Sequence, residues 1–208
     1  MKTIIVIICM FCSWLTTAQD YHKNMTLAMQ SWQAGKTKEA IAQFEQIAKT
    51  DKANWIPRYY QALVAITTAM KLQDVSEKET LIHAANKLIP QDDDERLNAE
   101  WLVLKALSLT AELLIDPAAR GRILSPKIVA YYEAAITLEP NNPRAISGLA
   151  EFNIRSKTYT GGNTTTECEQ LQKALSLYKT AKESEPFYPS WGQDRVEALL
   201  VTCKSEEK

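Results

Sequence analysis

The sequence contains few side chains that could carry out catalysis or bind a metal. It has two histidines, His22 and His83. His83 lies in a segment of helical periodicity, where a surface imidazole or one bonded within the fold is commoner than a ligand or a base. No His-x-x-x-His motif occurs, and no Cys-x-x-Cys motif occurs after residue 18, so a zinc site is not predicted. No glycine-rich phosphate-binding loop occurs either. We expect no catalytic residue, metal or cofactor, and hence no enzyme.

The acidic run 92–95, Asp-Asp-Asp-Glu, is the best remaining candidate for a cation site. It lacks the glycine and the ligand spacing of an EF-hand loop. Carboxylates are favoured at the N-terminus of a helix, where they interact with the backbone dipole. We therefore expect this run to cap a helix rather than to bind calcium.

The first eighteen residues have the pattern of a secretory signal peptide. Lys2 precedes an apolar run over 4–15, and the small residues of Thr16-Thr17-Ala18 follow at the expected cleavage site. The run is too short to span a membrane. The bulky residues before Cys9 and Cys12 disfavour lipid attachment. We predict cleavage after Ala18 and export to the periplasm or the exterior, without stable membrane insertion.

Composition excludes several fold classes and one class of partner for the mature chain, residues 19–208. With six glycines and eight prolines in 208 residues, the sequence has too few turn residues for a β-sandwich or β-barrel. Hydrophobic residues make up 46% and allow a packed core. The net charge of −1 gives no basic surface for nucleic acid.

Apolar residues recur at helical spacing through the mature chain, and no segment alternates with period two. Asp116-Pro117 ends one predicted helix, and Ser125-Pro126 begins the next with an N-cap and an N1 proline. An all-α chain of eight or nine helices follows. The stripes and helices predicted after residue 19 are 27–32, 40–48, 59–72, 81–88, 95–115, 125–138, 143–155, 167–184 and 191–203.

A spaced pattern repeats along these helices. A large residue, an alanine three positions later and a proline five positions after that occur at 82/85/90, 132/135/140 and 178/181/186. The pair Phe44 and Ile47 is a degraded copy. In each, the large residue packs between helices, the small one permits close approach, and proline ends the unit.

This pattern resembles the tetratricopeptide repeat family, most closely through Ala28, Gly35, Ala40 and Phe44 in the first unit. The resemblance implies an α-solenoid of about four antiparallel helix pairs and a C-terminal capping helix, in one domain over 19–208. The prolines lie farther apart than the family period, so the later units carry longer helices or loops. The chain also resembles small exported repeat proteins of Bacteroidota through the segments 54–55, 124–127, 150–153 and 191–192.

The resemblance also bears on Cys168 and Cys203, the two cysteines of the mature chain. Consecutive helices of such a solenoid are antiparallel, so these cysteines are placed at the same end of the last two helices. In an exported protein, this position predicts a disulfide. Two buried free thiols are the alternative.

In this family, the first helix of each pair lines a concave surface that binds a peptide or a helix. The resemblance places seven residues there, although apolar residues at helical spacing are more often buried. Arg155 is the candidate partner for a carboxylate. The predicted groove residues are Met29, Trp32, Tyr60, Thr67, Ser147, Glu151 and Arg155.

Two predicted loops, 116–124 and 157–166, interrupt the repeats and are either functional or simple spacers. The leading hypothesis is a non-catalytic scaffold that binds an unidentified protein or peptide in the cell envelope. The alternatives are a small-ligand protein or enzyme with a pocket between the divergent repeats, and a self-associating structural protein. The sequence does not determine the oligomeric state.

Overall fold

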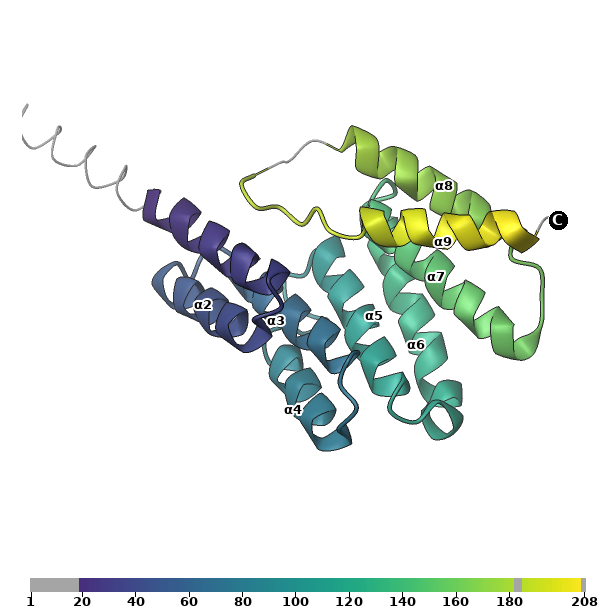
Figure 1. The fold of residues 1–208 in the computed structure, drawn as a ribbon, viewed down its shortest axis with the longest axis horizontal. Coiled ribbons are helices and arrows are strands. Elements are labelled where there is room, and N and C mark those ends of the chain that lie inside the picture. The colour runs from purple at the N-terminus through teal and green to yellow at the C-terminus, as the bar shows by residue number, and fades with distance from the viewer. Residues whose placement is uncertain (1–18, 182–184, 207–208) are drawn as a thin grey trace, which may run out of the picture. The chain divides into compact units, whose positions relative to one another are not determined.

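The computed structural model describes residues 19–181 and 185–206 (Figure 1). The predicted signal peptide lies outside these residues. All regular secondary structure in the described residues is helical, which confirms the predicted all-α, tetratricopeptide-like fold. The helices are residues 19–33, α2 (Thr37–Thr50), α3 (Ile56–Ala69), α4 (Val75–Asn86), α5 (Ala99–Leu113), α6 (Pro117–Leu138), α7 (Pro143–Thr160), α8 (Thr165–Thr180) and α9 (Gln193–Glu206).

The chain divides into two compact units between Ala65 and Ile66, within α3. In the described part of the first unit, helix 19–33 turns into α2 at Gly35, whose φ is 75°. The N–H of Gly35 donates to the carbonyl of Trp32, and that of Lys36 donates to the carbonyl of Ser31. This is a Schellman motif, and it requires the left-handed backbone that glycine adopts most readily.

The second unit holds α4–α9, and successive helices pack against one another along the chain. Figure 1 shows α5 beside α6, and α9 alongside α8. Gly148 of α7 lies directly against the buried Tyr132 of α6, where a β-carbon would come within 2.4 Å of the tyrosine ring. A glycine at this position therefore lets the two helices approach closely.

Helix α6 begins earlier than the sequence predicted. Asp116 accepts a hydrogen bond from the N–H of Ala119, with Pro117 in the first turn. Pro126 lies inside the helix, so the predicted start at Ser125 and the predicted loop 116–124 are wrong. Burial of Leu124 and Ile128 on one stripe stabilises the helix across the proline, which faces solvent.

Three other boundaries also differ. Helix α5 is capped by Asn98, which accepts from the N–H of Trp101, and not by the acidic run 92–95. Helix α7 extends to Thr160 and α8 begins at Thr165, which shortens the predicted 157–166 loop to 161–164.

The repeated pattern is buried as predicted in three of its four copies. In α8 the pair at 178/181 is not: Tyr178 is half-buried and Ala181 is exposed. Leu171 and Ala174, seven residues earlier and with the same spacing, are the buried pair. The register of the last unit is therefore shifted by two helical turns from the predicted one.

The predicted disulfide between Cys168 and Cys203 is present, with an S–S length of 2.03 Å. It joins the start of α8 to the end of α9. Beside it lies a small core of Ala150, Leu171, Val196 and Leu200. None of the described helices has the length and apolar content needed to cross a lipid bilayer.

Replacing both cysteines, Cys168→Ser with Cys203→Ser, is expected to lower the free energy of unfolding. Loss of a cross-link between residues 35 apart corresponds to at most about 4 kcal/mol of chain entropy. Urea denaturation of the oxidised protein and of the variant measures the difference. An unchanged midpoint would show that the α8–α9 hairpin does not depend on the cross-link.

Candidate functional site

Three of the predicted groove residues, Met29, Trp32 and Tyr60, lie in the first unit. Met29 and Trp32 are half-buried, while Tyr60 is buried. The rings of Trp32 and Tyr60 meet edge to face at 6.1 Å, and Tyr60 stacks on Phe44 at 5.5 Å. Tyr60 therefore packs against Trp32 in the interior and contributes almost no exposed surface.

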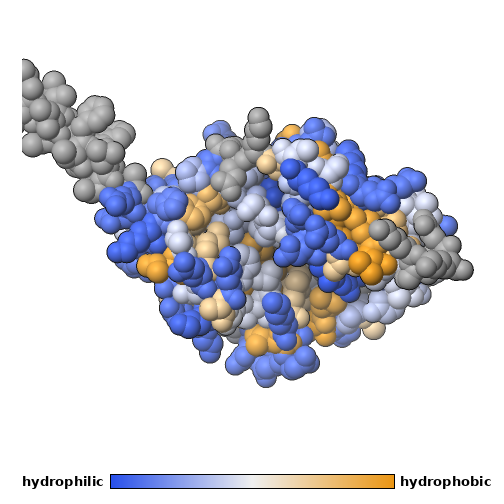
Figure 2. Space-filling model, turned by 45° about the horizontal axis from the view of Figure 1, so that its top comes forward, coloured by the Kyte–Doolittle hydropathy of each residue, from blue (hydrophilic) through white to orange (hydrophobic). Residues whose placement is uncertain are grey.

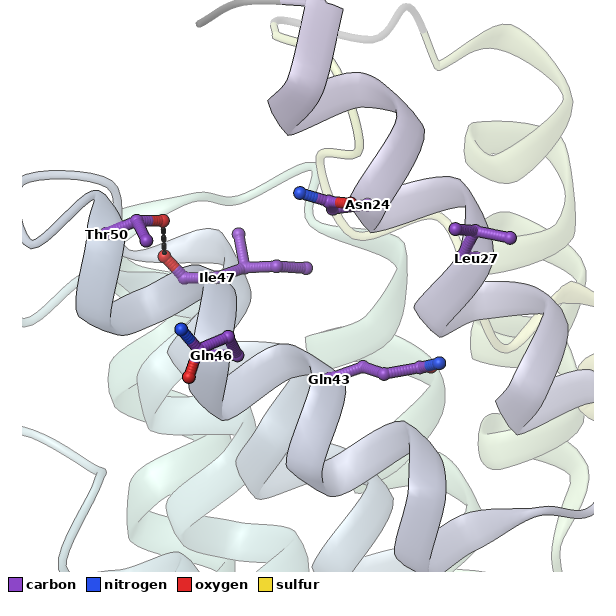
Figure 3. A pocket seen from close by; sticks show the side chains of 6 residues that line it. All are labelled: Asn24, Leu27, Gln43, Gln46, Ile47 and Thr50. Carbon is purple, nitrogen blue, oxygen red and sulfur yellow. Dashed lines mark hydrogen bonds between the residues drawn. The ribbon is translucent and has the colours of Figure 1, made fainter.

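A cavity of about 270 Å³ also lies in the first unit, between helix 19–33 and α2 (Figure 3). Its lining is uncharged, and it is smaller than the 300–1,000 Å³ usual for drug-sized ligands. None of the predicted groove residues lines it. The lining residues are Asn24, Leu27, Gln43, Gln46, Ile47 and Thr50.

In the second unit, the structure groups charged residues on α7 and α9. Glu151 accepts from Nε of Arg155 at 2.9 Å, and from Nε of Arg195 at 3.1 and 3.2 Å. The side chains of Arg155 and Arg195 are 58% and 50% exposed, whereas that of Glu151 is 24% exposed. We call these three residues the arginine cluster. Thr67 is half-buried at the end of α3, and Ser147 is buried one turn before Glu151.

Burial of the Glu151 carboxyl raises its pKa, but the hydrogen bonds and charges of Arg195 and Arg155 outweigh this effect. The net result is a pKa below the usual value. The same contact raises the pKa of Arg195. The cluster thus contains two cations and one ionised carboxylate at neutral pH.

Tyr159 extends the cluster along α7. It follows Arg155 by one helical turn, as Arg155 follows Glu151, so the three share one face of the helix. Tyr159 is 88% exposed, the highest value among the large hydrophobic side chains that the structure describes as exposed. An exposed aromatic ring therefore lies one helical turn from the exposed guanidinium group of Arg155.

A buried ion pair positions the N-terminal end of α7. Arg144 donates from Nε and Nη2 to the two carboxylate oxygens of Glu100, at 2.8 and 2.7 Å. Asn142 donates to Glu100 at 2.6 Å, and its side-chain oxygen caps α7. The guanidinium also lies over the ring of Tyr188, 5.9 Å from its centroid. Burial raises the pKa of Tyr188, with Glu100 adding to the effect.

The acidic run 92–95 has a different role from the predicted cap. Asp92 forms an ion pair with Lys105 and accepts from the hydroxyl of Tyr131 at 3.0 Å. These bonds join the segment before α5 to α5 and α6. Across the described ranges 19–181 and 185–206, no group of three His, Cys, Asp or Glu side chains is arranged to hold a metal ion.

Sequence reasoning found Glu151 and Arg155 but missed Arg195, Tyr159 and the Glu100–Arg144 pair. The spacing of Glu151, Arg155 and Tyr159 at i, i+4 and i+8 was visible in the sequence. The partnerships of Arg195 with Glu151 and of Arg144 with Glu100 each span 44 residues. They depend on tertiary packing and have no local signal.

Comparison with solved structures identifies the HusA haemophore from Porphyromonas gingivalis as similar, with a TM-score of 0.68 and 24% identity. The match covers 92% of this chain and 94% of that chain. A MamA RS-1 double mutant also matches, with a TM-score of 0.43 and 15% identity over 80% and 79% of the two chains. No protein-family model and no curated protein matches the sequence. The haemophore match establishes a shared fold over almost the full length of both chains.

We expect Glu100→Gln or Arg144→Met alone to destabilise the protein by about 3–5 kcal/mol, because each removes one charge of a buried ion pair and leaves the opposite charge in the interior. The double variant is expected to lose less than the sum of the two. Urea denaturation of the four proteins in this cycle gives the coupling energy. Lys36→Met, which removes an exposed ion pair with Glu39, serves as a control with a small effect. Additive losses would contradict direct coupling.

The arginine cluster predicts a pH-dependent contribution to stability. Because the folded-state pKa of Glu151 lies below its ordinary value of 4.5, its ion pairs stabilise the protein above that pH and are lost as pH falls below it. At pH 7, Glu151→Gln is expected to cost no more than about 1 kcal/mol, since both arginines are half-exposed. The difference from wild type should shrink toward pH 3.

Denaturation at the two pH values measures the effect. Glu133→Gln, at an exposed position of α6, is the matched control. A Glu151→Gln difference that stays constant between pH 7 and pH 3 would be inconsistent with ionised Glu151 as its source.

Proposed function

We propose that this chain is a non-catalytic, exported binding protein whose ligand is haem or a related tetrapyrrole. The observation that carries the proposal is the match to a haemophore along 92% of this chain and 94% of that one. A match of this extent covers the helices of both units, rather than one shared hairpin. At 24% identity, the ligand itself has to be tested directly.

The chemistry of the second unit supports this ligand class. A tetrapyrrole such as haem has a planar apolar ring and two anionic propionates. Tyr159 offers an exposed aromatic surface, and Arg155 of the arginine cluster offers an exposed cation one turn away. The signal-peptide pattern over 1–18 and the Cys168–Cys203 disulfide support export.

A second candidate is binding of a protein or peptide, which the repeat fold favours because such folds present extended surfaces. Figure 2 shows separate hydrophobic patches among hydrophilic side chains on the face it presents. Several large apolar side chains are about half or more exposed and could contact a partner. They are Leu27, Val75, Leu114, Ile123, Leu138 and Val201.

Titration of ferric haem into the purified chain distinguishes these candidates. Haem binding is expected to shift the Soret band and quench tryptophan fluorescence, saturating near one haem per chain with a Kd of about 1 μM or lower. The urea-unfolded protein is the control for non-specific association. A Soret spectrum that remains that of free haem at saturating protein would exclude haem and favour the peptide hypothesis.

A further inference from the structure

The arginine cluster has hydrogen-bonding capacity that Glu151 does not use. Among the described residues, Arg155 bonds to Glu151 through Nε alone. Arg195 uses Nε and Nη2. No described residue accepts a hydrogen bond from either terminal nitrogen of Arg155 or from Nη1 of Arg195, so these donors can bind a ligand. A guanidinium presents its donors in a planar fork that matches a carboxylate.

The charges of the cluster favour an anion. Two guanidinium groups share a single carboxylate, so the arginine cluster itself carries one net positive charge, and both of its arginines are about half-exposed. The carboxylates of Asp194 and Glu197 lie nearby in the sequence of α9. Lys157, the next cation along α7, is already bound to Glu167 at 2.7 Å and to the carbonyl of Asn163. Within the arginine cluster, the positive charge that Glu151 does not neutralise is shared by Arg155 and Arg195.

Glu151 also fixes where these cations lie. It holds Arg155 from the same helix and Arg195 from α9, and α9 is tied to α8 by the disulfide. A guanidinium held by a bond to Nε loses less conformational freedom when it binds a ligand. The site is therefore preorganised, although both side chains are exposed.

We propose that Arg155 and Arg195 form a carboxylate-binding site, and that Tyr159 contacts the ring of a ligand held there. This inference rests on the proposed function for the identity of the ligand: the propionates of haem bind the arginines, and the porphyrin face lies against Tyr159. One helical turn separates Arg155 from Tyr159, about 5–6 Å between β-carbons, which suits a ring and its carboxylate substituent.

The test compares two ligands and two double variants of the full chain. The ligands are ferric haem and its dimethyl ester, in which both propionates are uncharged. Arg155→Gln with Arg195→Gln removes the site. Arg96→Gln with Arg122→Gln makes the same change in charge at exposed positions outside α7 and α9. Circular dichroism and thermal melting confirm that each variant is folded.

We expect R155Q/R195Q to weaken haem binding about tenfold or more, and R96Q/R122Q to leave it unchanged. The ester is expected to bind wild type and R155Q/R195Q equally weakly. Equal losses of haem affinity in the two double variants would overturn the site, because only a general charge effect would remain. A full preference for haem over its ester in R155Q/R195Q would also overturn it.

A second measurement is independent of haem. Glutarate, a flexible dicarboxylate, is titrated into ¹⁵N-labelled protein, and the Nε–H signals of Arg155 and Arg195 are followed by NMR. Saturable shifts of these two signals, absent from Arg96, support the carboxylate site even where wild type binds no haem; that result would reject the proposed function alone. Unshifted signals together with haem binding that does not require the arginines would reject the site.

Tyr159 is tested by two substitutions at one exposed position. Tyr159→Phe is expected to retain haem affinity, because the ring is kept. Tyr159→Ala is expected to lower it about threefold to tenfold, within the range measured for single aromatic contacts. Equal affinity of the alanine and phenylalanine variants would exclude contact between Tyr159 and the porphyrin.

Discussion

The buried pair of Glu100 and Arg144 constrains how the helices of the second unit pack. Both charges are removed from solvent, so their bonds must all be made for the arrangement to be tolerated. Meeting that requirement fixes α7 against α5, and Asn142 adds the helix cap to the same network. The ring of Tyr188, in the segment before α9, packs against the guanidinium of Arg144. The start of α7 is thereby held in one position, and its direction determines where its C-terminal half emerges.

That C-terminal half carries the side chains of the candidate site. Successive turns of α7 pass from a buried end to an exposed end, so Glu151 is shielded while Arg155 and Tyr159 face solvent. Arg195 joins them from the first turn of α9, a helix that packs beside α8 through Val196 and Leu200 and is linked to α8 at its other end by the Cys168–Cys203 disulfide. The ion pair thus helps to position α7, and the apolar core and the disulfide help to position the helix that supplies the second arginine.

Local signals in the sequence predicted most of the helices but not all of their ends. Gly35, one of the four residues that carry the resemblance in the first unit, lies at the turn between two helices, where its left-handed backbone is a local requirement that glycine meets. Pro126 was misread as a helix start because a proline inside a helix is unfavourable on local grounds. The burial of Leu124 and Ile128 outweighs that cost, and burial is decided by residues distant in sequence. The shifted pair in α8 has the same origin, since two registers with identical spacing differ only in which one faces a neighbouring helix.

The candidate site likewise has one part that local sequence spacing predicts and another part that depends on tertiary packing. Glu151, Arg155 and Tyr159 follow one another at a spacing that the sequence displays, and a helix places them on one face without tertiary information. The sequence does not show that this face of α7 is exposed near the C-terminus of the helix. It also does not show that Arg195 of α9 bonds to Glu151. A single i, i+4 pair is a common surface feature of little consequence. A second arginine bonded to the same carboxylate makes this pair unusual, because one carboxylate then serves two guanidinium groups. The second arginine is Arg195, which lies in α9, 44 residues from Glu151. With it, the surface pair becomes the anion site that we propose.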